Sequence, residues 1–172
     1  MKKWICFVLL LLIPVLTGCS GTSKIAVSVL AGSNVDNVAD IPDNEASSAE
    51  YIGRVGVETN GTEIGFGSHY WNTNTEDHQT YGIYAIQYLV EEPNQPDLFS
   101  NVIGRPYITG QASLGLDADG DMWGIGVGTS HIMGGIEILT EFQVRSYDDA
   151  LKKLNGEDVD KYKLFIGPRF RF

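Results

Sequence analysis

The sequence predicts an all-β fold, an antiparallel up-and-down β-barrel of about eight strands. Three observations support this prediction. Apolar and polar residues alternate along most of the chain after residue 50, and a period of two indicates strands with unlike faces. Turn signals separate these stretches, the strongest being Asn60-Gly61, and favour antiparallel pairing. Glycines gather on single strand faces, as expected where a narrow barrel leaves little room: Gly65, Gly67, Gly124, Gly126 and Gly128.

The first eighteen residues have the layout of an export signal. Lys2 and Lys3 precede an apolar run that ends at Leu16, which is the order of regions in a secretory signal peptide. The segment Leu16-Thr17-Gly18-Cys19 resembles the lipobox of bacterial lipoproteins. This resemblance implies cleavage before Cys19, a diacylglycerol on its sulfur and, because Ser20 follows, sorting to the outer membrane. An ordinary secretory signal with a coincidental cysteine stays open as the alternative.

Charge and cysteine content exclude some classes of protein. Residues 1–18 contain two of the 12 Lys and Arg and none of the 22 Asp and Glu, so the mature net charge is 10 − 22 = −12. Such a surface repels nucleic acid, and no nucleic-acid partner is expected. Cys6 lies in the predicted signal and Cys19 would be acylated, so no disulfide is expected. The remaining 154 residues suit a single domain.

Strand-like patterns fill most of the mature chain. They cover residues 51–58, 62–71, 80–90, 105–116, 121–129, 135–146 and 162–172, and Lys24–Leu30 could supply an eighth strand. Residues 31–50 are rich in Asn, Asp, Ser and Ala and are predicted to form a polar loop. Asp148–Leu154 alone looks helical and is predicted to be a short loop helix. The chain therefore divides into a signal peptide (1–18), a lipidated N-terminus with a possible first strand and a polar loop (19–50), and a barrel domain (51–172).

The alternation separates a charged face from an apolar one. In the stretch 135–146, Ile138 and Phe142 lie on one face and Glu137 and Glu141 on the other. A soluble sheet would turn the apolar face inward, whereas a membrane barrel would turn it toward lipid. The glycines opposite the apolar residues favour the membrane barrel. We then expect a network of paired charges inside the lumen: Arg54, Glu58, Glu137, Glu141, Arg145, Arg169 and Arg171.

Over residues 24–172 the pattern resembles the eight-stranded outer-membrane β-barrels, the outer-membrane protein A-like and X-like group. The most specific part is a run of alternate residues that looks like the C-terminal signal read by the barrel-assembly machinery of that family: Tyr162, Leu164, Ile166, Phe170 and Phe172. Pro168 departs from this pattern and predicts a bulge, an edge or imperfect closure. Strands over 24–30 and 51–58 would be short for a membrane crossing of roughly 9 to 11 residues.

These patterns predict a non-enzymatic outer-membrane barrel lipoprotein with a plugged lumen and a structural or surface-interaction role. It would act through acidic loops at 31–50, 72–80 and 147–161. Its partners would be membrane lipid, through acylated Cys19 and the barrel exterior, and the machineries of barrel assembly and lipoprotein sorting. No cofactor is expected, because phosphate-loop, paired-cysteine and nucleophile-elbow motifs are missing from the sequence.

Two other functions stay open. The first is a periplasm-facing, lipid-anchored soluble β-barrel that binds an apolar ligand inside. The second is a lipid-A-modifying acyl hydrolase that uses His69 or His131 with a nearby Ser and Glu. Direct neighbours such as Ser68-His69 and Ser130-His131 would point to opposite faces of a strand, which weighs against the hydrolase.

One acidic loop partly resembles a calcium site. Asp117, Asp119 and Asp121 alternate around Gly120, and alternating carboxylates with a glycine can surround a hard cation. A calcium loop would also need a glutamate at its twelfth position, which is missing here. Asp and Gly are equally suited to a hairpin turn. A plain turn is therefore the preferred prediction, with calcium as the alternative.

Overall fold

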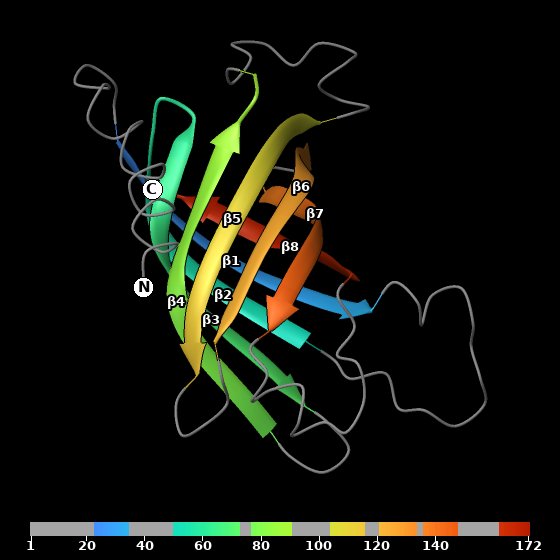
Figure 1. Cartoon of the computed structure of the whole chain (residues 1–172). Coiled ribbons are helices and arrows are strands. Elements are labelled where there is room, and N and C mark those ends of the chain that lie inside the picture. Colours follow the sequence, from blue (N-terminus) through green and yellow to red (C-terminus); the bar gives the residue numbers. More distant parts are fainter. Residues whose placement is uncertain are drawn as a thin grey trace.

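The structure, a computed structural model, describes residues 23–34, 50–72, 77–90, 104–115, 121–133, 136–147 and 162–172. They form eight strands: β1 (Lys24–Asn34), β2 (Glu50–Thr59), β3 (Thr62–Asn72), β4 (Asp77–Tyr88), β5 (Arg105–Gly115), β6 (Met122–Met133), β7 (Ile136–Tyr147) and β8 (Tyr162–Arg171). Each strand pairs antiparallel with the next, and β8 closes onto β1 (Figure 1). The predicted all-β barrel is confirmed, and the segment beginning at Lys24 supplies its eighth strand.

The strand pairing fixes the tilt of the barrel. Partners followed from Lys24 around the wall return to β1 at Asn34, ten residues further along, through Glu58, Glu63, Ile86, Thr109, Gly126, Gln143 and Lys163. For eight strands, a rise of about 3.3 Å per residue and a spacing of about 4.8 Å, this stagger gives a tilt of about 40°. A strand of eleven residues, such as β1, then rises about 28 Å along the barrel axis.

Two strands are longer than their composition suggested. The expectation that the strands over 24–30 and 51–58 are short is wrong, because β1 has 11 residues and β2 has 10. Ala31 pairs with Tyr51 and Gly32 with Glu50, so part of the predicted polar loop continues the ladder. The rest of that loop (35–49) and the predicted helix over 148–154 lie outside the described residues. Within the described ranges, no helix is long and apolar enough to cross a membrane.

The β1–β8 seam closes without a bulge. Ser28 pairs with Arg169 and Ala31 with Ile166 in one unbroken register, while Gly167 and Pro168 between them pair with β7 but have no partner on β1. The predicted bulge or edge at Pro168 is therefore wrong, whereas the predicted local imperfection of closure is confirmed as a gap of two pairs in the β1–β8 ladder. Proline cannot donate to the ladder, but the pairs on both sides hold the register. A Cβ on Gly167 would lie 1.9 Å from the Val29 carbonyl oxygen, so glycine permits the close approach of the two strands.

The predicted hairpin at Asn60-Gly61 is confirmed. Both residues have positive φ angles, 52° and 77°, as required by the two-residue type I′ turn that joins twisted antiparallel strands. We call the end of the barrel with this turn the hairpin end, and the other the far end. Phe172 also lies at the hairpin end, where its backbone exchanges hydrogen bonds of 2.9 and 3.0 Å with Ile25.

Candidate functional site: a charged lumen inside an apolar wall

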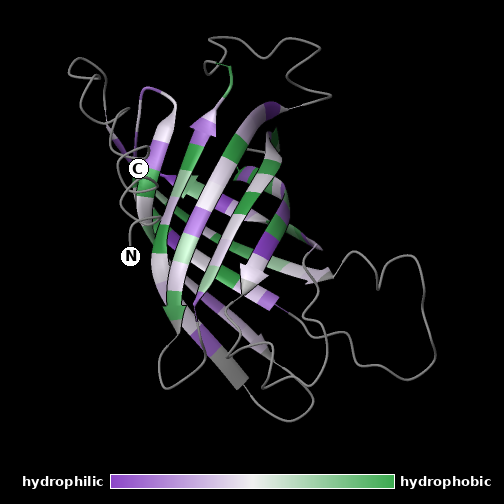
Figure 2. Cartoon of the chain, viewed as in Figure 1, coloured by the Kyte–Doolittle hydropathy of each residue, from purple (hydrophilic) through white to green (hydrophobic). Residues whose placement is uncertain are grey.

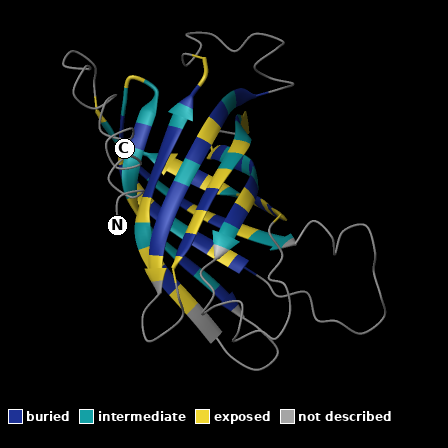
Figure 3. Cartoon of the chain, viewed as in Figure 1, coloured by how far each residue is buried: buried dark blue, intermediate teal, exposed yellow. Residues whose placement is uncertain are grey.

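The barrel turns its charged residues inward and its apolar residues outward. Arg169 is 1% exposed and Glu141 is fully buried, whereas Phe66 is 72% and Ile166 57% exposed. Hydropathy and burial alternate along the strands, so that buried positions are often hydrophilic and exposed positions often hydrophobic (Figures 2 and 3). A smaller apolar core shares the interior with the charges: Leu30, Ile52, Tyr84, Ile86, Tyr88, Tyr107, Leu139 and Phe165.

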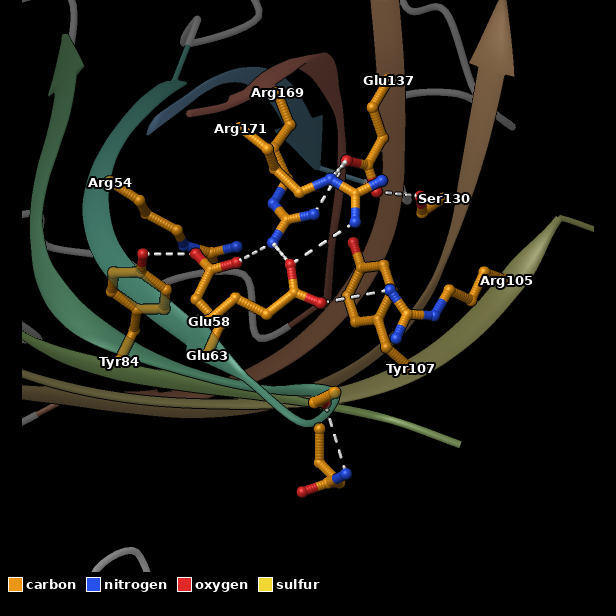
Figure 4. Close-up of polar contacts among 12 residues, drawn as sticks. Arg54, Glu58, Glu63, Tyr84, Arg105, Tyr107, Ser130, Glu137, Arg169 and Arg171 are labelled. Atoms are coloured by element: carbon orange, nitrogen blue, oxygen red, sulfur yellow. Dashed lines mark hydrogen bonds and ion pairs between the residues drawn. The ribbon is translucent and has the colours of Figure 1, made fainter. Parts of the chain in front are cut away.

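A cluster of six charges closes the hairpin end of the lumen. We call it the hairpin-end cluster: Glu58, Glu63, Glu137, Arg105, Arg169 and Arg171. Arg169 lies at its centre, with Nη1 2.8 Å from Glu137, and Nη2 2.7 Å from Glu58 and in contact with Glu63 (Figure 4). Three carboxylates face three guanidinium groups, so the cluster is neutral as a set.

Further contacts fix the carboxylates of the hairpin-end cluster. Arg105 Nη1 lies 3.2 Å from Glu58, and Arg171 Nε 3.0 Å from Glu137. The Tyr84 hydroxyl donates to Glu63 and the Ser130 hydroxyl to Glu137 (Figure 4). Each buried carboxylate therefore has both a cationic partner and a further hydrogen bond or ion pair, which offsets the cost of removing charge from water.

One ion pair crosses the middle of the lumen. Arg54 on β2 donates two hydrogen bonds of 2.8 Å to the two oxygens of Glu141 on β7. The Tyr107 hydroxyl adds a third bond to Glu141, at 3.1 Å, and Gln111 accepts from Arg54 at 3.3 Å. Paired fork-shaped hydrogen bonds of this kind are the strongest arrangement of arginine and carboxylate.

A third group fills the lumen toward the far end. Glu50 accepts from Arg145 Nη1 at 2.8 Å and contacts Lys163 and His69 Nε2 as well. The His69 ring stacks on Trp71 with a centroid distance of 4.7 Å. This far-end cluster of Glu50, His69, Arg145 and Lys163 thus places an arginine and a lysine around one carboxylate. A cavity of about 20 Å³, lined by Arg54, His69, Gln111 and Ser113 among others, has room for a water molecule.

The structure places all seven predicted network residues toward the lumen, with Arg171 at its rim. Sequence reasoning left five further residues out of the network: Glu50, Glu63, His69, Arg105 and Lys163. The alternation contained the signal for Glu63 and His69, which share a strand face with Gly65 and Gly67. The alternation also contained the signal for Lys163, which lies on the same strand face as Arg169. The alternation contained the signal for Arg105 too, which shares the face of Tyr107 and Gln111, whereas Glu50 falls in the predicted polar loop 31–50.

The other candidate residues lie apart from this network. Cys19, Asp117 and Asp119 fall outside the described residues, and Asp121 is exposed before β6. Among the described residues, no group of three His, Cys, Asp or Glu is arranged to hold a metal ion. His69 is buried inside while its neighbour Ser68 lies on the wall, and Ser130 is buried while His131 is half-buried. The five residues of the predicted assembly signal are all exposed: Tyr162, Leu164, Ile166, Phe170 and Phe172.

The outer wall has a rim of amphipathic aromatic residues at one end and a rim of purely apolar residues at the other. Outward aromatic residues with a polar atom gather toward the far end: Tyr51, Tyr70, Tyr81, Trp123 and Tyr162. The hairpin end instead exposes Ile25, Met133, Ile136 and Phe172. From Tyr162 to Phe172 is ten residues, or about 25 Å along the axis at this tilt. The apolar wall is therefore about as tall as the apolar band of a membrane β-barrel.

No protein-family model matches the sequence, and no curated protein matches it. Among solved structures, the fold is similar to the crystal structure of Neisserial surface protein A, with a TM-score of 0.50 and 12% sequence identity. The match covers 90% of this chain and 100% of that chain. At this identity the similarity concerns the fold alone, a closed antiparallel barrel of eight strands.

Proposed function

We propose that this chain is a membrane-spanning β-barrel of the bacterial outer membrane, with a plugged lumen and a structural or surface-interaction role. One observation carries the proposal: Glu141 and Arg169 are buried inside, while Ile166 and Phe170 are 57% and 45% exposed. A soluble barrel would bury the apolar side chains and hydrate the charges. Lipid makes the opposite arrangement favourable, because exposed apolar surface then meets acyl chains instead of water.

The dimensions of the barrel support a membrane crossing. Strands of 10 to 12 residues meet the roughly 9 to 11 residues needed by a tilted membrane strand. The ring of Tyr51, Tyr81, Trp123 and Tyr162 has the amphipathic side chains that prefer the border between lipid and water. Closure of β8 onto β1 leaves no unpaired edge along most of the wall, as a span in lipid requires.

Sequence features at the N-terminus extend the proposal to a lipoprotein. The lipobox-like Leu16-Thr17-Gly18-Cys19 would place a diacylglycerol at Cys19 in the periplasm-facing leaflet. Lipoprotein-sorting machinery would then deliver the chain, and barrel-assembly machinery would recognise the alternate residues of β8. Both machineries are proposed as partners of this chain.

The connections at the far end support a surface role. The connection between β1 and β2, residues 35–49, leaves and re-enters the barrel there and contains four acidic residues and no basic one. The hairpin end carries the turn at Asn60-Gly61 and the start of β1 near the predicted anchor. The far end would therefore face outward from the cell and present acidic loops to solvent or to a cationic partner.

The geometry disfavours the two alternative functions. A carrier of apolar ligands needs an apolar interior, whereas three sets of charges cross this lumen, centred on Arg169, Arg54 and Arg145. A hydrolase of the predicted type needs a serine beside its histidine. Ser68 and Ser130 lie on the faces opposite His69 and His131. Ser113 lines the same small cavity as His69, but its hydroxyl and His69 Nδ1 have no hydrogen-bond partner among the described residues.

A membrane-extraction experiment tests the proposal. The full-length chain would be expressed in a Gram-negative host, alongside Cys19→Ala and, as a matched control, Cys6→Ala in the predicted signal. We expect the barrel of both variants to stay in the membrane after a urea wash and to migrate faster in unboiled than in boiled detergent gels. Only Cys19→Ala should lose incorporation of labelled palmitate. A Cys19→Ala barrel that stays soluble without detergent would contradict the membrane assignment.

A further inference from the structure

A shallow apolar groove of about 590 Å³ crosses the outer wall of β1 to β4. It arises from two rows of paired residues that differ in height. The row Val27–Val55–Phe66–Ile83 is tall, with Phe66 standing 72% exposed. The next row toward the far end contains Gly53 and Ser68, which are small and form the floor.

The groove exists because Gly53 has no side chain. Gly53 lies on the outward face of β2, and a Cβ placed on it would meet no atom within 4 Å. Its partners across the strands are Val29 and Ser68, and Tyr51 and Tyr70 form the next row toward the far end, with rings 6.4 Å apart. Phe66 and Ile83 line one side of the groove, and Tyr81 lines it in the row of Gly53 and Ser68. Its volume lies in the range of sites that hold a small apolar molecule or chain.

The N-terminal segment enters the barrel on the same wall. The Ser23 hydroxyl hydrogen-bonds that of Thr59 at 2.9 Å, and the Ile25 backbone pairs with Phe172. These contacts fix the start of β1 at the hairpin end, beside β2. Cys19 precedes Ser23 by four residues, so its Cα lies within about 14 Å of that of Ser23.

The groove lies within reach of a lipid attached there. Val27, at its near edge, is four residues beyond Ser23, which is about 10 Å along the barrel axis at the observed tilt. An acyl chain spans half of the bilayer core, about 15 Å. A chain that starts at the hairpin end and runs toward the bilayer centre can therefore reach Val27 and Val55, and its end can reach Gly53, which pairs with Val29 at about 15 Å from Ser23 along the axis.

We propose that one acyl chain of the lipid on Cys19 lies in this groove. The inference rests on the proposed function, since it needs both lipidation and insertion in a membrane. The short link to Ser23 confines the lipid to the part of the barrel perimeter around the start of β1, which lies between β2 and β8. Such confinement raises its local concentration above that of a lipid free to diffuse around the barrel. The acyl chain then fills the space on the outer wall where Gly53 has no side chain.

Photo-cross-linking tests the inference. Cells expressing the full chain would be fed a palmitate analogue with a diazirine near its end, irradiated, and the purified protein digested for mass spectrometry. We expect the peptide containing acylated Cys19 to be joined to peptides of β1, β2 or β3 at Val27, Gly53, Val55 or Phe66. Phospholipid that carries the same analogue would give a different product, a barrel peptide joined to lipid without the Cys19 peptide.

Three substitutions sharpen the test. Gly53→Phe fills the floor of the groove and should reduce the Cys19 cross-link to this wall several-fold. Gly53→Val is a smaller change that should give a partial reduction if Gly53→Phe folds poorly. Val127→Phe on β6, where Val127 is 57% exposed, adds the same ring outside the groove and should leave the cross-link unchanged. Fast migration in unboiled gels reports folding in every case.

The outcomes separate this inference from the proposed function. Absence of the analogue from Cys19 would contradict the lipoprotein assignment itself. Labelled Cys19 that joins other strands, or a groove that captures only phospholipid, would overturn the inference and leave the membrane barrel standing. A cross-link that persists undiminished in folded Gly53→Phe would overturn it equally.

Discussion

Arg54 and Glu141 face each other across the barrel and share two hydrogen bonds of 2.8 Å, although 87 residues separate them in the chain. Both side chains are buried, at 1% and 0% exposure. The pair joins β2 to β7, which are not neighbours in the wall. It therefore braces the barrel across its interior in addition to the hydrogen bonds between adjacent strands.

Removal of one member of this pair should destabilise the barrel strongly. Glu141→Leu leaves the Arg54 guanidinium buried without its carboxylate, and the loss of one partner of a buried ion pair costs about 3–5 kcal/mol. Urea-induced unfolding in lipid vesicles, followed by gel migration, measures the effect. The double variant Arg54→Met, Glu141→Leu removes both charges and should recover most of the stability. Equal stability of the single variant and the native chain would show that the pair does not brace the lumen.

A charge on the outer wall should be costly in proportion to its depth in the membrane. Ile166 lies near the middle of β8 and Tyr162 at its far end, and both are exposed. Ile166→Arg should lower the free energy of unfolding in vesicles by about 2–4 kcal/mol, and Tyr162→Arg at the membrane border by about 0–1 kcal/mol. If both substitutions had the same small effect, the outer wall would be facing water.

The β1–β8 seam should depend on the lack of a side chain at Gly167. A Cβ there would collide with the Val29 carbonyl oxygen, at 1.9 Å, so Gly167→Val must push the two strands apart. We expect a smaller fraction of the fast-migrating folded form after refolding into detergent micelles. Gly53→Val is the matched control, because its Cβ meets no atom within 4 Å. Similar yields for the two variants would show that closure tolerates a side chain at the seam.

The sequence predicted the wall better than the interior. Alternation assigned Glu137 and Glu141 to one face and Ile138 to the other, because successive side chains of a strand point to opposite faces of the sheet. It could not show that Arg54 meets Glu141, because that contact depends on the ten-residue stagger set by all eight strand pairings together. Ala31 was assigned to a loop by composition alone, whereas pairing with Tyr51 keeps it in the ladder.

Pro168 shows that a local sequence rule can locate a feature without predicting its effect on the whole barrel. Its missing N–H predicted a local defect, and the ladder does lose its pairs at Gly167 and Pro168. The seam nevertheless keeps its register, because the pairs from Ser28 to Arg169 and from Ala31 to Ile166 are separated by equal lengths of both strands. A local rule located the gap, but only the whole seam determined its consequence.

The lumen should be closed to ions in the native chain and leak when Arg169 is removed. Arg169 contacts Glu58, Glu63 and Glu137 together. In Arg169→Ala, these three carboxylates would keep, among the described residues, only Arg105 and Arg171 as cationic partners. Repulsion among the carboxylates and the lost side-chain volume should open the hairpin end to water. In planar bilayers we expect no steady conductance for the native barrel, and brief cation-selective openings for Arg169→Ala, because the remaining excess charge is negative.

Arg171→Ala is the matched control for this measurement. Arg171 belongs to the same cluster but lies at the rim, with 14% of its side chain exposed, so its loss leaves Arg169 bridging all three carboxylates. Its conductance should remain that of the native barrel. Since gel migration reports folding independently, a leak in folded Arg169→Ala alone would assign the plug to Arg169. A steady open pore in the native barrel would mean instead that water and ions displace these ion pairs, and that the lumen serves as a channel.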